Sequence, residues 1–165
     1  MMGVGINGDN SRSALLTVGA EIYKEWSLES SMVFFTEDYK SEDGNGGKVK
    51  TDSDVFFFTL APVYTYSLTQ NFDVYGKAGL QIRRANTKTV FSGGDLKKDQ
   101  KHTGTGSDIG YTYGFGIQYT TTQPIFADSR LRVRAGADWH KGFNGNDGVG
   151  TTDKPVFGFQ AGLTF

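Results

Sequence analysis

The sequence predicts an all-β protein: an eight-stranded antiparallel up-and-down β-barrel that crosses a membrane. Apolar and polar residues alternate with period two along much of the 165-residue chain, whereas helical spacings of three and four are hard to find. Short and long polar connections follow one another between the strand-like segments. This order is typical of membrane barrels, which have short turns at one end and long loops at the other. A low mean hydropathy is compatible with this fold, because only one face of each strand must be apolar.

Four strands are expected in the first half of the chain. A short strand at residues 2–7 precedes two segments, 16–23 and 28–35, that form a hairpin around a tight turn at Glu25-Trp26. The fourth strand spans residues 56–66. The apolar face of these strands consists of Leu16, Val18, Ala20, Ile22, Leu28, Met32, Phe34, Phe56, Phe58, Leu60, Tyr64 and Tyr66.

Pro62 interrupts the fourth strand, because proline has no backbone N–H to donate. A closed barrel has no edge strand where a missing donor is harmless, so Pro62 predicts a β-bulge or a strand that begins late. A bulge there would reverse the facing expected for Phe56 and Phe58.

Four more strands are expected in the second half, at residues 72–83, 111–120, 131–139 and 157–165. Their apolar face consists of Phe72, Val74, Ala78, Leu80, Ile82, Tyr111, Tyr113, Phe115, Ile117, Tyr119, Leu131, Val133, Ala135, Ala137, Trp139, Phe157, Phe159, Ala161, Leu163 and Phe165. The short connections are residues 25–26, 68–71 and 122–128, and the polar, Gly-rich ones are residues 8–12, 40–53, 84–108 and 140–154. No interdomain linker is evident, so residues 1–165 are expected to form a single outer-membrane β-barrel domain.

The faces opposite the apolar ones carry regularly placed charges, which predicts that the apolar faces contact lipid and the charges line the lumen. A soluble ligand-binding barrel, with the apolar set inside, is the alternative. The expected interior charge network is Glu21, Glu29, Lys77, Arg132, Arg134 and Asp138, with Gln118 and Gln160 beside it. Charges in a narrow lumen must pair. We expect Glu21 to pair with Lys77 or Arg134, with Glu29 and Arg132 nearer the short turns.

Aromatic residues gather near the short-turn ends of the strands, as expected for an interfacial girdle. They are Trp26, Tyr64, Tyr66, Phe72, Tyr119 and Phe165.

Several ordered segments resemble the OmpA-like transmembrane domain of small Gram-negative outer-membrane proteins. They are Leu16-x-x-Gly19 through Tyr23, Ser27-Leu28-Glu29, Asp73-Val74-Tyr75-Gly76-Lys77-Ala78-Gly79, Tyr113-Gly114-x-Gly116 with Tyr119, Leu131-x-Val133-Arg134-Ala135, and the C-terminal series Phe157, Phe159, Ala161, Leu163 and Phe165. The resemblance covers nearly the whole chain. It implies an outer-membrane location and an assembly signal, formed by Phe157, Phe159, Leu163 and Phe165, for the barrel-assembly machinery. We expect no peptidoglycan-binding domain after Phe165, and the short first strand suggests that an N-terminal segment has been removed.

Composition excludes several kinds of chemistry. The 17 Lys and Arg residues nearly balance the 18 Asp and Glu residues, which disfavours nucleic-acid binding. The chain has no Cys, so thiolate metal sites and Cys nucleophiles are excluded. No metal-ligand spacing or cofactor motif is found, and the sequence predicts neither a metal nor a cofactor.

A few motifs have a possible chemical role and a simpler structural one. His140, near Asp138 at the edge of a loop, is interpreted as structural, and His102 lies in a predicted loop. The Gly-rich segments 43–47 and 144–148 resemble calcium loops but lack the remaining carboxylates, which favours ordinary turns. The basic segment 97–102 is interpreted as a solvated loop, although it would suit lipopolysaccharide phosphates.

We therefore expect a monomeric, non-enzymatic outer-membrane protein of a Gram-negative bacterium. Its structural role in the envelope would leave the surface loops free for ligands or host surfaces. Its expected partners are outer-membrane lipids, lipopolysaccharide and, during biogenesis, the barrel-assembly machinery. A general-diffusion pore is disfavoured, because an eight-stranded barrel has room only for its own side chains. A narrow low-conductance channel and a lipid-modifying enzyme that uses His140 are the alternatives.

Overall fold

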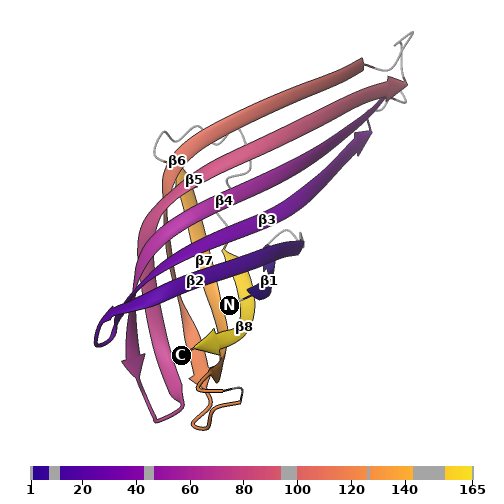
Figure 1. The fold of residues 1–165 in the computed structure, drawn as a ribbon. Coiled ribbons are helices and arrows are strands. Elements are labelled where there is room, and N and C mark those ends of the chain that lie inside the picture. The colour runs from indigo at the N-terminus through magenta and orange to yellow at the C-terminus, as the bar shows by residue number, and fades with distance from the viewer. Residues whose placement is uncertain are drawn as a thin grey trace.

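The computed structural model describes residues 2–7, 12–42, 47–93, 100–125, 127–142 and 155–164. They form eight strands: β1 (Met2–Asn7), β2 (Arg12–Tyr23), β3 (Trp26–Glu42), β4 (Gly47–Ser67), β5 (Phe72–Gly93), β6 (Gln100–Thr120), β7 (Arg130–Gly142) and β8 (Val156–Thr164). Each strand pairs antiparallel with the next, and β1 pairs with β8, so the sheet closes into a barrel (Figure 1). The predicted all-β, eight-stranded antiparallel barrel is confirmed. No helix among these residues is long and apolar enough to cross a membrane.

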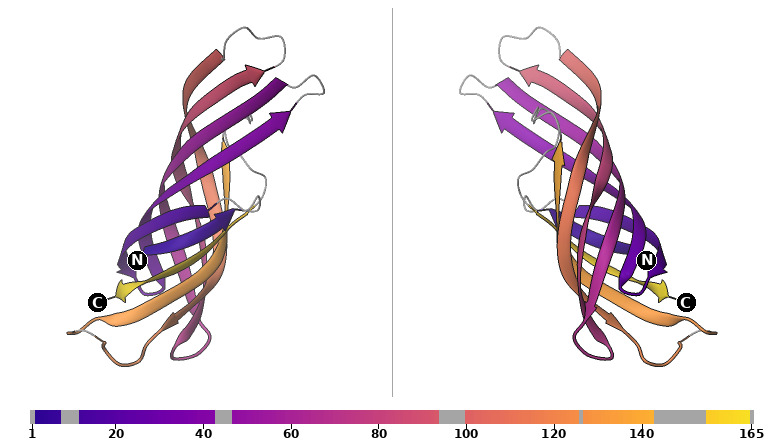
Figure 2. Two further views of the ribbon diagram at one scale, coloured as in Figure 1. Left: turned by 90° about the vertical axis from the view of Figure 1, so that its right-hand side faces the viewer. Right: turned by 90° about the vertical axis from the view of Figure 1, so that its left-hand side faces the viewer.

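The turns after β2, β4 and β6 lie at one end of the barrel, and the C-terminal ends of the odd-numbered strands point toward the other end (Figure 2). The turn between β2 and β3 needs only Lys24 and Glu25, because Lys24 adopts a positive φ of 46°. Trp26, expected in this turn, is the first residue of β3. The end that carries these three turns is called the short-turn end below.

Strands β3 to β6 are 17 to 22 residues long, whereas the other four have 6 to 13. The four long strands therefore project beyond the rest of the barrel, away from the short turns (Figure 1). Their projecting part is called the ribbon: residues 36–42 of β3, 47–54 of β4, 84–93 of β5 and 100–107 of β6.

The ribbon corrects the expectation of long loops at 40–53 and 84–108. β3 continues to Glu42 and β4 begins at Gly47, while β5 continues to Gly93 and β6 begins at Gln100. Threonines on facing strands hydrogen-bond across the ribbon, as Thr51 does with Thr89. Polar, β-branched residues can form strands with both faces in water, so polarity alone does not mark a loop.

The expected facing of the strands is confirmed where side chains are described. Leu60, Ile82 and Phe115 point outward with 47%, 53% and 63% of their surface exposed, whereas Arg134 and Gln118 are buried inside. Pro62 causes no bulge. The pairing of β3 with β4 is unbroken through Leu28 and Pro62, and the pairing of β4 with β5 resumes at Val63 in the register that it had at Leu60. The missing N–H thus interrupts the ladder locally without shifting it.

Aromatic pairs mark both ends of the outward apolar belt. At the short-turn end, the rings of Trp26 and Tyr64 lie 5.1 Å apart and those of Phe72 and Tyr119 lie 5.0 Å apart. At the ribbon end, the pairs are Phe34 with Phe56, at 4.9 Å, and Tyr113 with Trp139, at 5.5 Å. Aromatic rings at both borders of an apolar band are typical of the girdles of a membrane barrel.

Candidate functional site

The lumen is crossed by an ion pair between opposite walls. Arg134 of β7 donates from Nη1 to Oε1 of Glu29 on β3 over 2.6 Å, and both side chains are more than nine-tenths buried. Strands β3 and β7 lie four positions apart in a ring of eight, so this contact spans the full width of the barrel. The pair therefore bridges the lumen and neutralises both charges.

The rest of the Arg134 guanidinium is also engaged. Its Nε donates to Oε1 of Gln118 over 2.8 Å, and Gln118 donates from Nε2 to Asp73 over 2.8 Å. The guanidinium carbon lies 4.7 Å from the centre of the Tyr75 ring. Because a buried arginine needs several acceptors at once, these contacts hold the group in one position.

A second ion pair lies farther from the short turns. Lys77 on β5 donates from Nζ to Oδ2 of Asp138 on β7 over 2.8 Å. The strand between them contributes Gly114, where an added Cβ would collide with Oδ1 of Asp138. Glycine at this position gives the two long side chains the room to meet. The residues Glu29, Tyr75, Lys77, Gln118, Arg134 and Asp138 are called the polar layer below.

His140 lies inside the barrel, which corrects its expected place at the edge of a loop, because β7 continues to Gly142. The amide of Gln81 donates from Nε2 to the carbonyl of Lys141, which leaves its Oε1 as the acceptor that lies 2.7 Å from Nδ1 of His140. Neutral His140 therefore carries its proton on Nδ1. Its ring stacks on Phe57 from β4, with centroids 4.7 Å apart.

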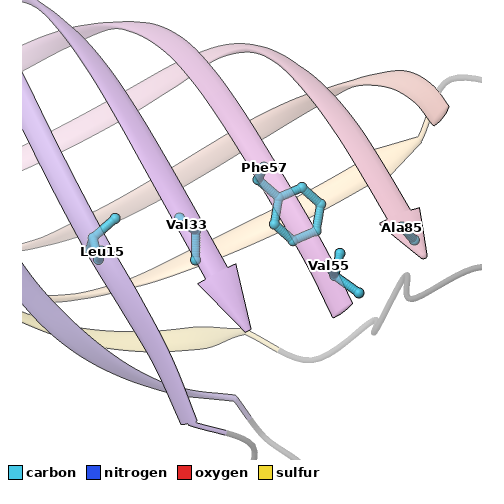
Figure 3. Close-up of a cluster of buried hydrophobic side chains, with 5 residues drawn as sticks. All are labelled: Leu15, Val33, Val55, Phe57 and Ala85. Carbon is cyan, nitrogen blue, oxygen red and sulfur yellow. The ribbon is translucent and has the colours of Figure 1, made fainter. Parts of the chain in front are cut away.

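Phe57 belongs to a cluster of buried apolar side chains inside the barrel: Leu15, Val33, Val55, Phe57 and Ala85 (Figure 3). This apolar layer covers β2 to β5 on the ribbon side of the polar layer, since Val33 follows Glu29 along β3 and Ala85 follows Lys77 along β5. Through Phe57 and His140 it also reaches β7, so the lumen is crossed a second time.

The predicted pairing of Glu21 is wrong. Arg134 forms an ion pair with Glu29, and Lys77 forms one with Asp138. Glu21 instead lies 3.8 Å from Arg132, and 70% of the Glu21 side chain is exposed. The structure thus brings Glu29, Lys77, Arg134 and Asp138 into the lumen and leaves Glu21 at its rim. The shear of the barrel is the reason, because residues at equal counts from a turn do not share a depth when strands are tilted and staggered.

Two hollows open at the rim beside Arg132. One has a volume of about 360 Å³ and reaches Glu29, and the other, of about 340 Å³, reaches Asp73 and Gln118. The polar layer is therefore accessible from the short-turn end up to the Glu29–Arg134 pair.

The remaining sequence motifs contribute little chemistry. Phe157, Phe159 and Leu163 point outward on β8, and Phe165 lies outside the described residues. Residues 43–46, 97–99 and 144–148, from the calcium-like and basic segments, also lie outside them, whereas His102 is an exposed residue of β6. Within the described part of the chain, no group of three or more His, Asp or Glu side chains is placed to hold a metal ion.

Comparison with known proteins gives one family match and two crystal structures with a similar fold. The sequence model of the OmpA-like transmembrane domain matches residues 8–135. No curated protein sequence matches the chain. Two crystal structures of Ail, the attachment invasion locus protein of Yersinia pestis, have a similar fold. In the one in complex with the heparin analogue sucrose octasulfate, the TM-score is 0.53 at 17% identity, over 98% of this chain and 92% of Ail. For the other Ail structure, the TM-score is 0.50 at 15% identity, and the match covers 98% of this chain and 90% of Ail.

Proposed function

Because the chain belongs to the OmpA-like transmembrane domain family, and so is a β-barrel protein of the Gram-negative outer membrane, we propose that it is a non-enzymatic envelope protein whose extracellular part binds ligands or host surfaces. In this family's kind of barrel the short turns face the periplasm. The short-turn end is then periplasmic, and the ribbon stands outside the cell. The ribbon is the observation that carries the proposal, because strands of 17 to 22 residues far exceed the roughly 9–11 residues that cross a bilayer.

The contacts inside the barrel support a closed scaffold rather than a pore. The Glu29–Arg134 pair and the Phe57–His140 stack cross the lumen at two different levels. The channel alternative requires both contacts to open. The lipid-modifying alternative needs His140 at the lipid face or at the rim, but its ring is buried in the lumen against Phe57.

The crystal structure of Ail with a heparin analogue suggests the ligand class for the first test, a sulfated saccharide. The experiment compares the intact protein with a variant in which residues 88–104 are replaced by a short Gly-rich turn, both in detergent. Binding of fluorescent heparin oligosaccharide is measured by anisotropy, and conductance is recorded in planar bilayers. We expect binding that is lost on shortening, and no conductance in either protein. Binding that survives shortening, or steady conductance in the intact protein, would overturn the proposal.

The same role implies a monomer that meets the barrel-assembly machinery once, during biogenesis. Phe157, Phe159 and Leu163 form an outward series on β8 that points to this signal, with Phe165 as its last member. Deletion of Phe165 is expected to lower outer-membrane levels in cells while refolding in detergent is unchanged. Normal cellular levels of the deleted protein would argue against a signal at this end.

A further inference from the structure

The wall of the barrel is incomplete between β2 and β8 at the short-turn end. The strand that joins them, β1, begins at Met2, which pairs with Leu16 on one side and with Ala161 on the other. Both neighbours continue beyond this point toward the short turns. The space between their ends is called the slot below. It contains one of the two hollows beside Arg132, the one of about 360 Å³.

Two strand edges face each other across the slot. Residues 18–23 of β2 pair with β3, and residues 163–164 of β8 pair with β7. Within the described part of the chain, no strand pairs with either stretch on its slot side. Every second residue of an antiparallel strand directs its N–H and C=O to the same edge. Both edges therefore present backbone donors and acceptors to the slot.

These edges lie inside the apolar belt. Val18 and Leu163 point outward, with 62% and 47% of their surfaces exposed. Tyr23, at the end of β2, pairs with Trp26, one of the aromatic residues that border the belt. An open strand edge at this depth has neither water nor a partner strand for its backbone groups, which is costly in a bilayer. One further strand in the slot would satisfy both edges at once.

The residues around the slot define the side chains that such a strand needs. On the outward side it would lie beside Val18, Ala20 and Leu163, which favours apolar residues. On the inward side it would lie beside Gly19 and Glu21. The Glu21 side chain is 70% exposed, so a cationic residue opposite it gains a carboxylate partner. The slot therefore fits a strand in which apolar and polar residues alternate.

Gly19 brings the slot next to the polar layer. A Cβ at this position would lie 2.7 Å from Cγ of Glu29, so Glu29 packs directly against the backbone of β2. The hollow in the slot is lined by Glu29 and Arg132. A polar side chain opposite Gly19 would therefore cover the Glu29–Arg134 pair from the side where the wall is incomplete.

We propose that the slot is an acceptor site for one extended strand of a separate polypeptide, with apolar and polar residues in alternation. The strand lies in line with β1 and antiparallel to β2 and β8, because β1 has this orientation to the same two strands. A lipid acyl chain, which could also enter from the belt, offers no hydrogen bonds to the two edges. The slot opens at the short-turn end, and the inference rests on the proposed function only in making this the periplasmic side.

The test uses a synthetic peptide, Val-Lys-Ile-Thr-Val, whose residues in this order lie opposite Ile22, Glu21, Ala20, Gly19 and Val18 of β2. Its control replaces the central Ile by Pro, which cannot donate a backbone hydrogen bond. Both peptides carry fluorescein at the N-terminus, and anisotropy gives their affinities for the protein in detergent. The heat-induced gel shift verifies that each protein variant is folded.

We expect the Pro peptide to bind at least tenfold more weakly than the alternating peptide, because the strand ladder is broken at its centre. Glu21→Gln should weaken binding of the alternating peptide about threefold, and should not affect a peptide with Gln in place of Lys. Glu25→Gln, which removes the same charge beside the other hollow, is the matched control and should change neither. Equal binding of the Pro peptide, or equal effects of the two substitutions, would overturn the site.

Disulfide cross-linking locates the bound peptide, because the chain has no Cys of its own. Under mild oxidation, a peptide with Cys at its third position should cross-link to Ala20→Cys, and one with Cys at its fifth position to Leu163→Cys. Cross-links to both edges would support a strand between them. Cross-links to one edge alone would mean that the peptide lies on the outer surface, and none at all would mean that lipid fills the slot. Either result would overturn the proposal.

The same measurements are made on the protein isolated from outer membranes, after its intact mass is determined. If this protein carries residues before Met1 and binds no peptide, the strand in the slot belongs to the same chain. The assignment to a separate polypeptide would then be overturned.

Discussion

The two layers that cross the lumen do so by different physical means. In the polar layer, Arg134 donates from Nη1 to Glu29 and from Nε to Gln118, and its guanidinium lies over the Tyr75 ring. In the apolar layer, Phe57, Val55 and Val33 fill space without directional bonds. The polar layer is stabilised by the pairing of specific charges, and the apolar layer is stabilised by the volume that its side chains fill.

This difference determines how each layer responds to substitution. Removal of one member of a buried ion pair leaves the other charge without compensation in a dry site, so the second substitution restores stability. Removal of an apolar side chain leaves a cavity that no second polar change can repair. Double variants therefore distinguish the layers better than single ones.

The largest effect is expected for Arg134→Met, which leaves the Glu29 carboxylate buried and alone. The free energy of unfolding should fall by about 4 kcal/mol. Urea unfolding in phospholipid vesicles, followed by tryptophan fluorescence, measures it. The double variant Glu29→Leu/Arg134→Met should recover most of the loss. A double variant as unstable as the single one would show that this pair acts by packing.

Phe57→Ala should lower the free energy of unfolding by about 3 kcal/mol, because a large ring is lost from both the apolar layer and the stack on His140. Phe57→Leu, which retains most of the volume, should cost about 1 kcal/mol in the same urea experiment. Equal losses for the two variants would mean that stacking on His140, rather than filled volume, is what stabilises this level.

Lys77→Met should cost about 2 kcal/mol, less than Arg134→Met, because the carboxylate left behind is less completely buried. Asp138 has 17% of its side chain exposed, against 6% for Glu29. The double variant Lys77→Met/Asp138→Asn serves as the control in the urea series. A loss as large as that of Arg134→Met would indicate that both pairs lie in equally dry surroundings.

The smallest effect is expected outside the lumen. Replacement of residues 88–104 by a short turn should change the free energy of unfolding by less than about 1 kcal/mol, since loops and projections on a rigid scaffold tolerate change. The heat-induced gel shift should be retained. Failure to fold would show that the ribbon supports the barrel and would remove the contrast between scaffold and projection.

The sequence was sufficient to predict the barrel, its strand order and the inward face that carries Glu29, Lys77, Gln118, Arg134 and Asp138, because period-two alternation survives wherever one face is apolar and the other polar. Tyr75 was not predicted as a member of the polar layer. Nor could the sequence reveal the apolar layer. Val33 lies between Met32 and Phe34, and Phe57 between Phe56 and Phe58, so both faces of these strands are apolar and the alternation disappears. The remaining indication for Val33 was its position four residues after Glu29, because residues an even number of positions apart on a strand point to the same face.

The pairing within the polar layer and the ribbon were beyond the sequence for other reasons. Glu21 and Glu29 have the same charge on neighbouring strands, and only the stagger of the barrel assigns Arg134 to Glu29. In the ribbon, strands with water on both faces have no apolar side, so a polar segment such as 84–93 looks like a loop. Whether such a segment is a strand or a loop depends on its pairing with the neighbouring strand, which cannot be read from composition.

The unequal strand lengths also bear on the order of events during folding. β3 to β6 are consecutive in the chain and pair with their neighbours along most of their length, whereas β1 pairs with β8 through residues that are distant in the sequence. Contacts close in sequence form early, because little chain entropy is lost when they close. The hairpins β3–β4 and β5–β6 are therefore expected to form the nucleus, and the short strands to join an existing four-stranded sheet. Variants in the ribbon would then change the rate of folding more than the stability of the folded barrel.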